Sequence, residues 1–379
     1  MHRDDFVRRI HSPGGDRRRL RSMHLDIPLL LILIVLCLGG LFVLYSASGQ
    51  NLYFVKRQAV FMLIGFVAMI TVAQFPVRFW ERWAIMFYII GLLSLVAVMF
   101  FGVGAKGAQR WLDLGITRFQ PSELMKVAVP MMVSAFLGKR YIPPSFQHIV
   151  ISLTLILIPV VLIMNQPDLG TAILVFISGF FVLFLAGLGK RYLISAFLLL
   201  MAAIPSFWIF VMRDYQKQRV LTLLSPEDDK LGAGWNIIQS TTAIGSGGLA
   251  GKGWMQGTQS QLNFLPESHT DFIIAVLAEE FGLIGVLCLC AVYFVFVGRC
   301  LLIALNSQSQ FGRLIAGSLG LTFFIYIFVN MSMVSGILPV VGVPLPLISY
   351  GGTSVVALFL GFGILMAIST EPKRIRMEL

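Results

Sequence analysis

Apolar runs of similar length recur along almost the whole chain, from residue 27 to residue 369. Each is long enough for an α-helix to cross the hydrocarbon core of a bilayer, which takes about 20 residues. Backbone polar groups in lipid must be hydrogen-bonded inside the protein, and continuous apolar runs satisfy this as helices. Charged residues make up 12% of the 379 residues, against about 25% in a soluble domain. The sequence therefore predicts an all-α, polytopic integral membrane protein.

We expect about ten transmembrane helices. The predicted spans cover residues 27–47, 58–75, 84–102, 122–138, 148–164, 169–187, 192–211, 271–297, 314–334 and 353–369. The loop 212–270 lies between spans 7 and 8 and is too long to be a simple connection, so it is expected to be functional or structured. The apolar segment 335–352 holds three prolines, which predicts an irregular loop buried against protein rather than a helix.

Basic residues indicate how the chain is oriented in the membrane. With the N-terminus inside, 18 of the 29 Lys and Arg residues fall on the inner side, as the positive-inside rule expects. Both termini are therefore predicted to be cytoplasmic, and the loop 212–270 extracytoplasmic. The chain then divides into an Arg-rich cytoplasmic tail at 1–24, a transmembrane domain at 25–370 and a basic cytoplasmic C-terminus at 371–379.

The net charge of +11 does not indicate a protein that binds nucleic acid. Seven arginines lie in the first 21 residues and three basic residues lie near the C-terminal end. Such clusters at membrane edges are typical of topology signals or of contacts with anionic lipids. The four cysteines fall in or beside apolar spans and predict no disulfide framework. The five histidines are scattered and no HExxH motif occurs, so no zinc site built by the protein is expected.

A carboxylate at the outer edge of the eighth span is the first candidate site residue. Asp271 is expected on the first turn of that helix, with Ser268 and Thr270 as candidate caps. There it faces the outer loop and the positive end of the helix dipole. From the residues alone, a helix-capping role and a chemical role both stay open. Small residues follow on the same helix face and favour close packing by another segment: Ala275, Ala278 and Gly282.

Charged residues inside the predicted spans are costly and therefore indicate functional sites or ion pairs. Glu123 and Lys126 are spaced i, i+3 at the start of the fourth span and are expected to pair. Glu279 and Glu280 lie two turns deeper than the start of the eighth span, so at least one must face protein or water. Asp168 begins the sixth span, where helix capping alone would account for it.

The outer segment before the fourth span carries two cations and a tryptophan, Lys106, Arg110 and Trp111. One interpretation is an interfacial helix anchored by Trp111, with Arg110 reaching to lipid headgroups. The other is a clamp for a diphosphate group, since Lys and Arg neutralise phosphate well. The sequence alone favours neither.

Eight glycines lie in residues 232–257 of the long loop. Lys252 after a glycine superficially resembles a phosphate-binding loop, but Ser246 and Gly253 occupy positions where that motif needs Gly and Ser or Thr. Nucleotide binding is therefore not expected. A flexible hinge, or a backbone that approaches a ligand closely, is the predicted role.

Several motifs in order resemble the SEDS family (shape, elongation, division and sporulation), over about residues 25 to 370. They are Gly107–Trp111, Gln120–Glu123, Gln166–Thr171, Phe264–Glu267, His269–Phe272 and Pro344–Gly352. The segment Gly336–Pro344 is more similar to RodA, the elongation member, than to FtsW, the division member. The Arg-rich N-terminal tail lies outside the resemblance.

The resemblance implies a peptidoglycan glycosyltransferase with ten spans in the bacterial cytoplasmic membrane. Such an enzyme polymerises lipid II on the outer face and carries the growing strand as a glycan-diphosphate-undecaprenol. The resemblance also implies a class B penicillin-binding protein as transpeptidase partner, and cytoplasmic partners of cell elongation that include the MreB system. The family's essential aspartate falls on Asp271.

The chemistry implied by the resemblance fits the residues singled out above. An α-linked diphospholipid donor and a β-linked product require one inverting displacement, with a base for the acceptor hydroxyl and cations for the departing diphosphate. We assign Asp271 as the base. The expected diphosphate contacts are Lys106, Arg110, Arg219 and Lys126, while Glu123 and Asp168 are expected to organise the cavity. The sequence requires no cofactor, although magnesium or manganese could bridge diphosphate and carboxylate.

Two other functions stay open from the sequence. Ten spans with broken helices and charges at membrane depth would also suit a lipid II flippase, although the polar features cluster on the outer side rather than at the midplane. A non-catalytic scaffold of the elongation complex is the third reading. It predicts that Asp271→Asn retains function.

Overall fold

The computed structural model describes residues 24–105, 108–113, 115, 118–229, 232–261, 265 and 267–372. Each of the ten predicted spans corresponds to a helix of the described chain. These helices are α2 (Ile27–Ala47), α3 (Leu52–Ala73), α4 (Val77–Phe101), α5 (Pro121–Leu137), α6 (Phe146–Asn165), α7 (Leu169–Leu185), α8 (Lys190–Ser206), α12 (Ile273–Asn306), α13 (Gln310–Val334) and α14 (Gly352–Ser369). The prediction of a polytopic helical protein is confirmed.

Eight of these helices, with α8 continued to Phe210, are long and apolar enough to cross a membrane by themselves. The other two, α5 and α7, have 17 residues each, and α5 carries the charges of Glu123 and Lys126. Packing against neighbouring helices accounts for the short length of both helices and for the charges of α5, because α5 and α7 contact each other and α13. Most residues of α5 are buried in the bundle.

Polar side chains set where several helices begin. Asp26 accepts a hydrogen bond from the backbone N–H of Leu29 at 3.0 Å at the start of α2. Asn51, Asp168 and Ser309 act in the same way at α3, α7 and α13. Each satisfies an N–H group that the first helical turn leaves without a partner.

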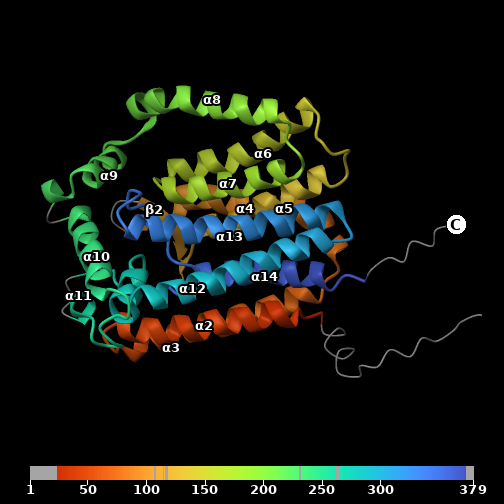
Figure 1. Cartoon of the computed structure of the whole chain (residues 1–379). Coiled ribbons are helices and arrows are strands. Elements are labelled where there is room, and N and C mark those ends of the chain that lie inside the picture. Colours follow the sequence, from red (N-terminus) through yellow and green to blue (C-terminus); the bar gives the residue numbers. More distant parts are fainter. Residues whose placement is uncertain are drawn as a thin grey trace, which may run out of the picture.

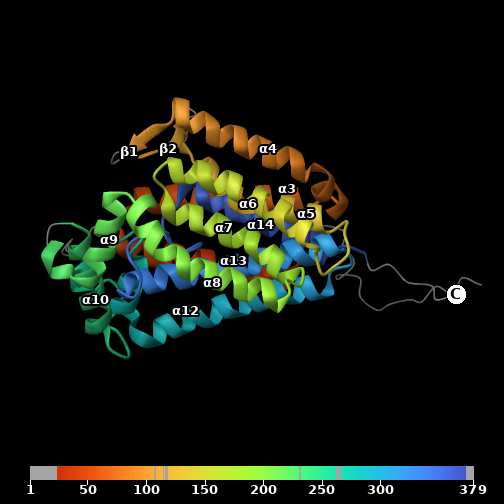
Figure 2. The same ribbon diagram turned by 90° about the horizontal axis from the view of Figure 1, so that it is seen from above.

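The helices run roughly side by side, and the segments outside them gather at one end of the bundle (Figures 1 and 2). That end, called the outer end here, carries α9 (Asp214–Leu224), α10 (Ala233–Gly247) and α11 (Thr258–Gln261). The long loop 212–270 therefore contains regular structure, as its length predicted. Ser369 at the end of α14 donates a hydrogen bond to Asp26, so the chain leaves α14 at the end where α2 begins.

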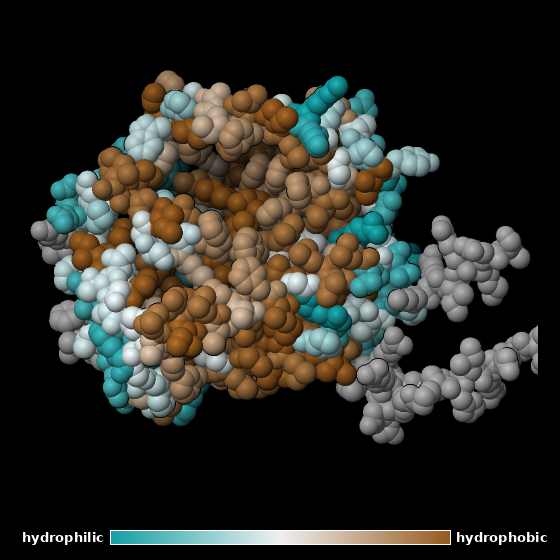
Figure 3. Space-filling model, viewed as in Figure 1, coloured by the Kyte–Doolittle hydropathy of each residue, from teal (hydrophilic) through white to brown (hydrophobic). Residues whose placement is uncertain are grey.

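Helix α8 lies at the side of the bundle, and none of its residues is buried. Figure 3 shows a hollow between α8 and the body of the molecule, and the face is hydrophobic over its middle with hydrophilic residues towards both ends. An apolar belt between polar ends is the surface that a bilayer requires. The five residues after α8, η1 (Phe207–Val211), form a π-helical turn.

Of the two interpretations of the segment around Trp111, the interfacial helix is wrong. The chain instead forms a three-stranded antiparallel sheet of β1 (Val103–Ala105), β2 (Ala108–Asp113) and β3 (Arg118–Phe119). Trp111 pairs with Val103, and Asp113 pairs with Arg118. The segment between α4 and α5 has to reverse direction twice within a few residues, and short antiparallel strands do so while pairing their backbone groups.

The apolar loop between α13 and α14 is irregular, as its prolines predicted, and it is held against protein. Tyr293 donates from its hydroxyl to the carbonyl of Pro346 at 2.7 Å. Gln58 donates to the carbonyl of Ser349 at 3.2 Å and accepts from the N–H of Gly351 at 3.2 Å. These side chains replace the hydrogen bonds that a helix would have made internally, which non-helical backbone at membrane depth requires.

Candidate active site

A cavity of about 760 Å³ opens at the outer end of the bundle, and the described residues that line it are strongly charged. Its walls come from α3, the small sheet, α5, α7, the turn before α12 and the loop that leads into α14. Four of the lining side chains are cations: Arg57, Arg110, Arg118 and Lys126. Four are carboxylic acids: Asp113, Glu123, Asp168 and Asp271.

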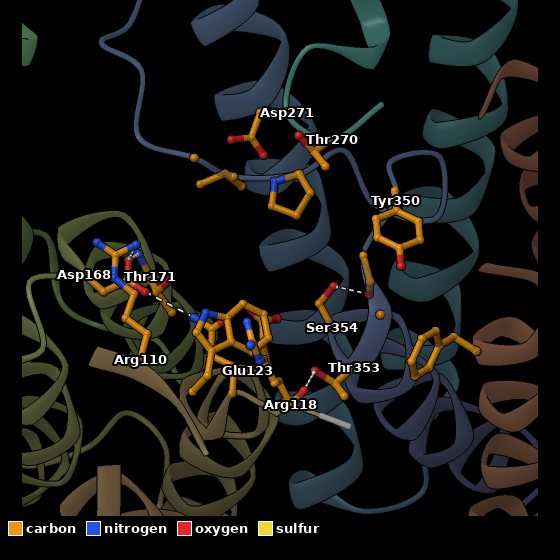
Figure 4. Close-up of a pocket in the computed structure, with 18 of the residues that line it drawn as sticks. Arg110, Arg118, Glu123, Asp168, Thr171, Thr270, Asp271, Tyr350, Thr353 and Ser354 are labelled. Atoms are coloured by element: carbon orange, nitrogen blue, oxygen red, sulfur yellow. Dashed lines mark hydrogen bonds and ion pairs between the residues drawn. The ribbon is translucent and has the colours of Figure 1, made fainter. Parts of the chain in front are cut away.

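Asp271 lies in the turn that precedes α12 and lines the cavity. In Figure 4 its carboxylate points into the open space, with Arg110 and Asp168 across that space. The helix begins at Ile273, and its N-cap residue, Phe272, makes no side-chain cap hydrogen bond. The expectation that Asp271 sits on the first helical turn was therefore wrong by two residues.

The two candidate caps are not caps either. Ser268 donates to the carbonyl of Ala47 on α2 at 2.9 Å. Thr270 donates to the carbonyl of Glu267 at 3.2 Å. Both hydroxyls are engaged by the path of the turn itself, because contacts from α2 and from the turn's own backbone override the local capping preference.

The backbone of the Asp271 turn is held by α13 and by the loop before α14. The side-chain amide of Asn330 donates to the carbonyl of Asp271 at 2.9 Å and to the carbonyl of Val343 at 2.7 Å. Ser349 donates to the carbonyl of Thr270 at 2.5 Å. A side chain at Gly342 would come within 3.5 Å of the Asp271 carboxylate. The turn is thus fixed through carbonyl groups on two sides.

His269, in the same turn, packs on aromatic rings. Its ring centroid lies 4.8 Å from that of Phe54 and 6.2 Å from that of Tyr350. Burial lowers the pKa of His269, and the nearby Glu267 carboxylate raises it less, so the pKa stays below its usual value. The ring is therefore neutral at pH 7 and adds no positive charge beside Asp271.

Arg110 and Asp168 meet across the opposite wall. Nη1 of Arg110 lies 3.8 Å from Oδ1 of Asp168, and the guanidinium donates to the carbonyl of Pro167. Asp168 also accepts from the N–H of Thr171 at 3.3 Å and from Gln120 at 3.2 Å. Asp168 is therefore a helix cap, as the sequence allowed, and a wall of the cavity as well. The Arg110 side chain contacts Asp168 and Pro167 inside the protein. The interpretation that it reaches to lipid headgroups is therefore wrong.

Glu123 and Lys126 form the predicted ion pair, with Nζ 2.6 Å from Oε1. Both are buried at the start of α5. The ammonium also lies 4.7 Å from the centroid of the Tyr326 ring, a favourable position for a cation over an aromatic face. Both charged residues line the cavity, so the pair is part of the site and not only of helix packing.

The remaining two predicted residues have different outcomes. Arg219 does not line the main cavity but a neighbouring one of about 50 Å³, which also touches Arg110 and Asp168. Lys106 lies outside the described residues, so its role stays a prediction. Five of the seven predicted site residues are thus brought together in one cavity.

The polar lining residues that were missed from the sequence include Arg57, Arg118 and Tyr350. Arg57 and Arg118 counted only as outer positive charges, and Tyr350 only as part of a family motif. They lie too far apart along the chain for any local spacing pattern to indicate that they meet. The sole signal was that each lies in or beside an outer segment that carries other polar residues.

Among the described residues, no group of three His, Cys, Asp or Glu side chains lies close enough together to hold a metal ion. The acids of the cavity come from different walls, and two of them, Glu123 and Asp168, already have cationic partners. A divalent cation bound here would therefore take most of its ligands from a substrate diphosphate.

Comparisons with known proteins agree on one family. The model of a family of cell cycle proteins, FtsW/RodA/SpoVE, matches residues 27–374. The peptidoglycan glycosyltransferase MrdB of Escherichia coli strain K12 is 56% identical over 352 residues, which cover 93% of this chain and 95% of that protein. A probable peptidoglycan glycosyltransferase FtsW of Geobacter sulfurreducens is 38% identical and covers 92% of this chain.

Solved structures show the same fold. A chain of a peptidoglycan synthase complex that coordinates polymerization and crosslinking superimposes with a TM-score of 0.80 at 29% identity, covering 91% of this chain and 97% of that chain. The rod shape determining protein RodA of Thermus thermophilus superimposes with a TM-score of 0.69 at 26% identity, covering 91% and 96%.

Proposed function

The chain belongs to the FtsW/RodA/SpoVE family of cell cycle proteins, and we propose that it polymerises lipid II into β-1,4-linked glycan strands with Asp271 as general base. It is a multi-pass membrane protein and a peptidoglycan glycosyltransferase, like its 56% identical relative. The observation that carries the proposal is one cavity at the outer end that joins Asp271 to four cationic side chains.

The proposed reaction is a single displacement with inversion. A carboxylate oxygen of Asp271 accepts the proton of the acceptor sugar hydroxyl, while the hydroxyl oxygen attacks the anomeric carbon of the donor sugar. The bond between this carbon and the diphosphate oxygen breaks, and undecaprenyl diphosphate leaves with the bonding electrons. A positioned base of this kind contributes about 10²- to 10⁴-fold to the rate.

The cations of the cavity neutralise the negative charge of the diphosphate. Arg110 and Lys126 stabilise the negative charge that develops on the leaving group, since preorganised cations act strongly in a site that excludes water. Each already has a carboxylate partner, Asp168 and Glu123, which holds it in place. Arg57 and Arg118 supply further positive charge, which a reaction between two diphosphate-linked substrates needs. Arg219 and Lys106 are proposed to extend the diphosphate contacts beyond this cavity.

A divalent cation is a separate proposal. Magnesium or manganese would bridge the substrate diphosphate and a cavity carboxylate and add Lewis-acid stabilisation when bound. Removal of metals with EDTA, followed by addition of each ion, measures the requirement through polymer yield and through binding of the diphosphate lipid itself.

Membership of the family supports a proposal for the partners and the location. We propose the bacterial cytoplasmic membrane, with the outer end of the bundle on its outer face and with membrane lipids around the helices. A class B penicillin-binding protein would supply the transpeptidase, since a similar chain belongs to a complex that coordinates polymerization and crosslinking. The MreB system would contact the cytoplasmic side.

The test is polymerisation of purified lipid II by the native protein, by Asp271→Asn and by Asp113→Asn. Asp113 is the matched control, because it is a carboxylic acid that lines the same cavity but accepts a hydrogen bond from the N–H of Gly115 within its own loop, at 2.8 Å. We expect Asp271→Asn to lose at least about 10²-fold in rate, and Asp113→Asn to stay near native.

Other outcomes separate the alternatives. If neither native protein nor variant makes polymer, with the penicillin-binding protein present, while the native protein moves lipid II across vesicle membranes, the flippase function is favoured. If Asp271→Asn polymerises at the native rate, Asp271 is not the base.

A further inference from the structure

Helix α12 is broken near its outer end, and a segment of the long loop fills the break. Gly282 has φ 65° and ψ −163°, a conformation that is essentially restricted to glycine. Residues 273–281 therefore form a separate half-helix of about two and a half turns. The backbone groups freed by the break bond to residues 248–253: Leu283 N–H to Gly248 O, Ile284 N–H to Leu249 O, Lys252 N–H to Glu279 O and Gly253 N–H to Glu280 O, each at 3.0 or 3.1 Å.

The glycines of this segment allow the close approach. A side chain at Gly247 or Gly251 would collide with the carbonyls of Ala278 and Glu280 on the half-helix. The structure therefore shows a close backbone approach to α12. Of the three small residues predicted to favour packing on this helix, Ala275, Ala278 and Gly282, the loop touches Ala278 and Gly282.

Glu279 ties the half-helix to the same loop through its side chain. The side chain is fully buried, and its Oε1 lies 2.7 Å from Nζ of Lys252. It also accepts from the N–H and the hydroxyl of Thr258 at 2.8 and 3.0 Å, and from the N–H of Gln259 at 3.1 Å. The Glu279 carboxylate thus joins α12 to the start of α11, two elements that the chain does not connect directly.

The other end of the half-helix is Asp271. Phe272 alone separates it from Ile273. The carbonyls of Asp271 and of Thr270, one residue earlier, accept hydrogen bonds from Asn330 and Ser349. Helical hydrogen bonds within residues 273–281 couple Glu279 to the residues that directly follow the Asp271 turn. A change at Glu279 is therefore carried to the Asp271 turn without a change in any residue of the cavity.

We propose that Glu279 is a positioning residue for Asp271: its buried contacts with Lys252 and Thr258 fix the half-helix and so the placement of the base. The inference rests on the proposed role of Asp271. Glu279 is not among the described residues that line the cavity, so it acts through the half-helix. Neither the comparisons nor the reaction itself assigns it a function.

The chain provides a matched control in a second buried ion pair. At the opposite end of the bundle, Nη2 of Arg299 lies 2.6 Å from Oδ2 of Asp26, which is buried as Glu279 is. Removal of the Asp26 charge also breaks a buried pair between two helices. It does so far from the half-helix, so it reports the cost of losing such a pair without moving Asp271.

The test compares Glu279→Gln, Lys252→Met, Lys252→Arg and Asp26→Asn in the full chain, with lipid II as substrate. We expect Glu279→Gln and Lys252→Met to lower kcat by about 10- to 100-fold, the scale of a 1 Å misplacement, with little change in KM. Lys252→Arg, which keeps the charge, should restore most of kcat. Asp26→Asn should lower the unfolding temperature but leave kcat near native.

A second readout does not depend on activity. Hydrogen exchange should become faster for backbone amides of residues 267–275 in Glu279→Gln and Lys252→Met, and stay unchanged there in Asp26→Asn. Should Glu279→Gln fail to fold, the Lys252 pair of variants decides, because the Lys252 side chain is 28% exposed and tolerates replacement.

The inference is overturned if kcat of the folded Glu279 and Lys252 variants matches that of Asp26→Asn, or if amide exchange at 267–275 is unchanged. Failure of the proposed function has a different signature. In that case Asp271→Asn would polymerise at the native rate, while the exchange experiment would still report whether Glu279 fixes the turn.

Discussion

Asn330 offers a sharp test of how the Asp271 turn is held. Its side-chain amide is fully buried on α13 and donates to the carbonyls of Asp271 and Val343 at 2.9 and 2.7 Å. The change Asn330→Leu keeps the size of the side chain but removes both donors. The turn that carries Asp271 and the loop before α14 then lose the bridge through Asn330, while the hydrogen bond from Ser349 to Thr270 remains.

The expected magnitude follows from the two carbonyls. A buried acceptor left without a donor costs about 1–3 kcal/mol. Val343 is buried, so the loss of the donor to its carbonyl carries the larger cost. The Asp271 turn borders the cavity, where water can bond to the Asp271 carbonyl, so the cost of losing that donor falls at the low end of the range. We expect Asn330→Leu to lower the free energy of unfolding by about 3 kcal/mol in total.

The effect on catalysis is expected to exceed the effect on folding. A shift of about 1 Å in the base costs about 10²-fold in rate, so kcat for lipid II polymerisation should fall by about that factor in the folded variant. Ser318→Ala is the control, because Ser318 lies on the same helix and donates to the carbonyl of Ser178 at 2.6 Å, deep in the bundle. Its loss should lower stability without lowering kcat.

Thermal unfolding in detergent and single-turnover polymerisation measure the two quantities on the same samples. The reasoning is refuted if Asn330→Leu is destabilised as expected and yet polymerises at the native rate. It is also refuted if Ser318→Ala loses kcat to the same extent, since the loss would then reflect general loosening of α13.

Three further predictions follow from single contacts. Gly282→Ala should unfold at a clearly lower temperature, because alanine does not adopt φ 65° with ψ −163° and its Cβ would collide with the backbone of the 248–253 segment. The control Gly298→Ala should keep the native unfolding temperature, because a Cβ there meets nothing within 4 Å. Burial raises the pKa of Asp26, but hydrogen bonds, chiefly from Arg299, outweigh it, so the pKa is lowered. The stabilisation of the fold by the Asp26 carboxylate is therefore complete above about pH 4 and is lost as the pH falls below that value. The difference in unfolding temperature between the native protein and Asp26→Asn should shrink as the pH is lowered below about 4. Arg110→Lys should raise KM for lipid II about tenfold in steady-state assays, because lysine keeps the charge but not the planar fork.

The helical framework could be predicted because membrane helices are specified locally. An apolar run of sufficient length has to be a helix in lipid, whatever surrounds it. The pairing of Glu123 with Lys126 could be predicted for the same reason, since three residues on one helix fix the geometry. The irregular loop before α14 followed from prolines, which act on their own backbone.

The errors lie where contacts distant in sequence decide the outcome. Ser268 has the chemistry of a helix cap, but its hydroxyl bonds to Ala47, more than two hundred residues earlier. Arg57 and Arg118 line one cavity only because α3 and the small sheet both border it at the outer end. The bond between Lys252 and Glu279 has no local signature, since the two residues lie on different elements joined by a long loop.

The way in which the turn is held bears on the choice between a cap and a base. A carboxylate that caps a helix has its oxygens engaged by the N–H groups of the first turn, which stabilises the anion but weakens it as a proton acceptor. Helix α12 begins without such a bond: its N-cap residue is Phe272, and the turn is fixed through carbonyls by Asn330 and Ser349. The position of the Asp271 carboxylate is therefore set by the path of the backbone, and its side chain points into the cavity rather than back to the helix end. This arrangement suits a group that must receive a proton from a substrate held in front of it.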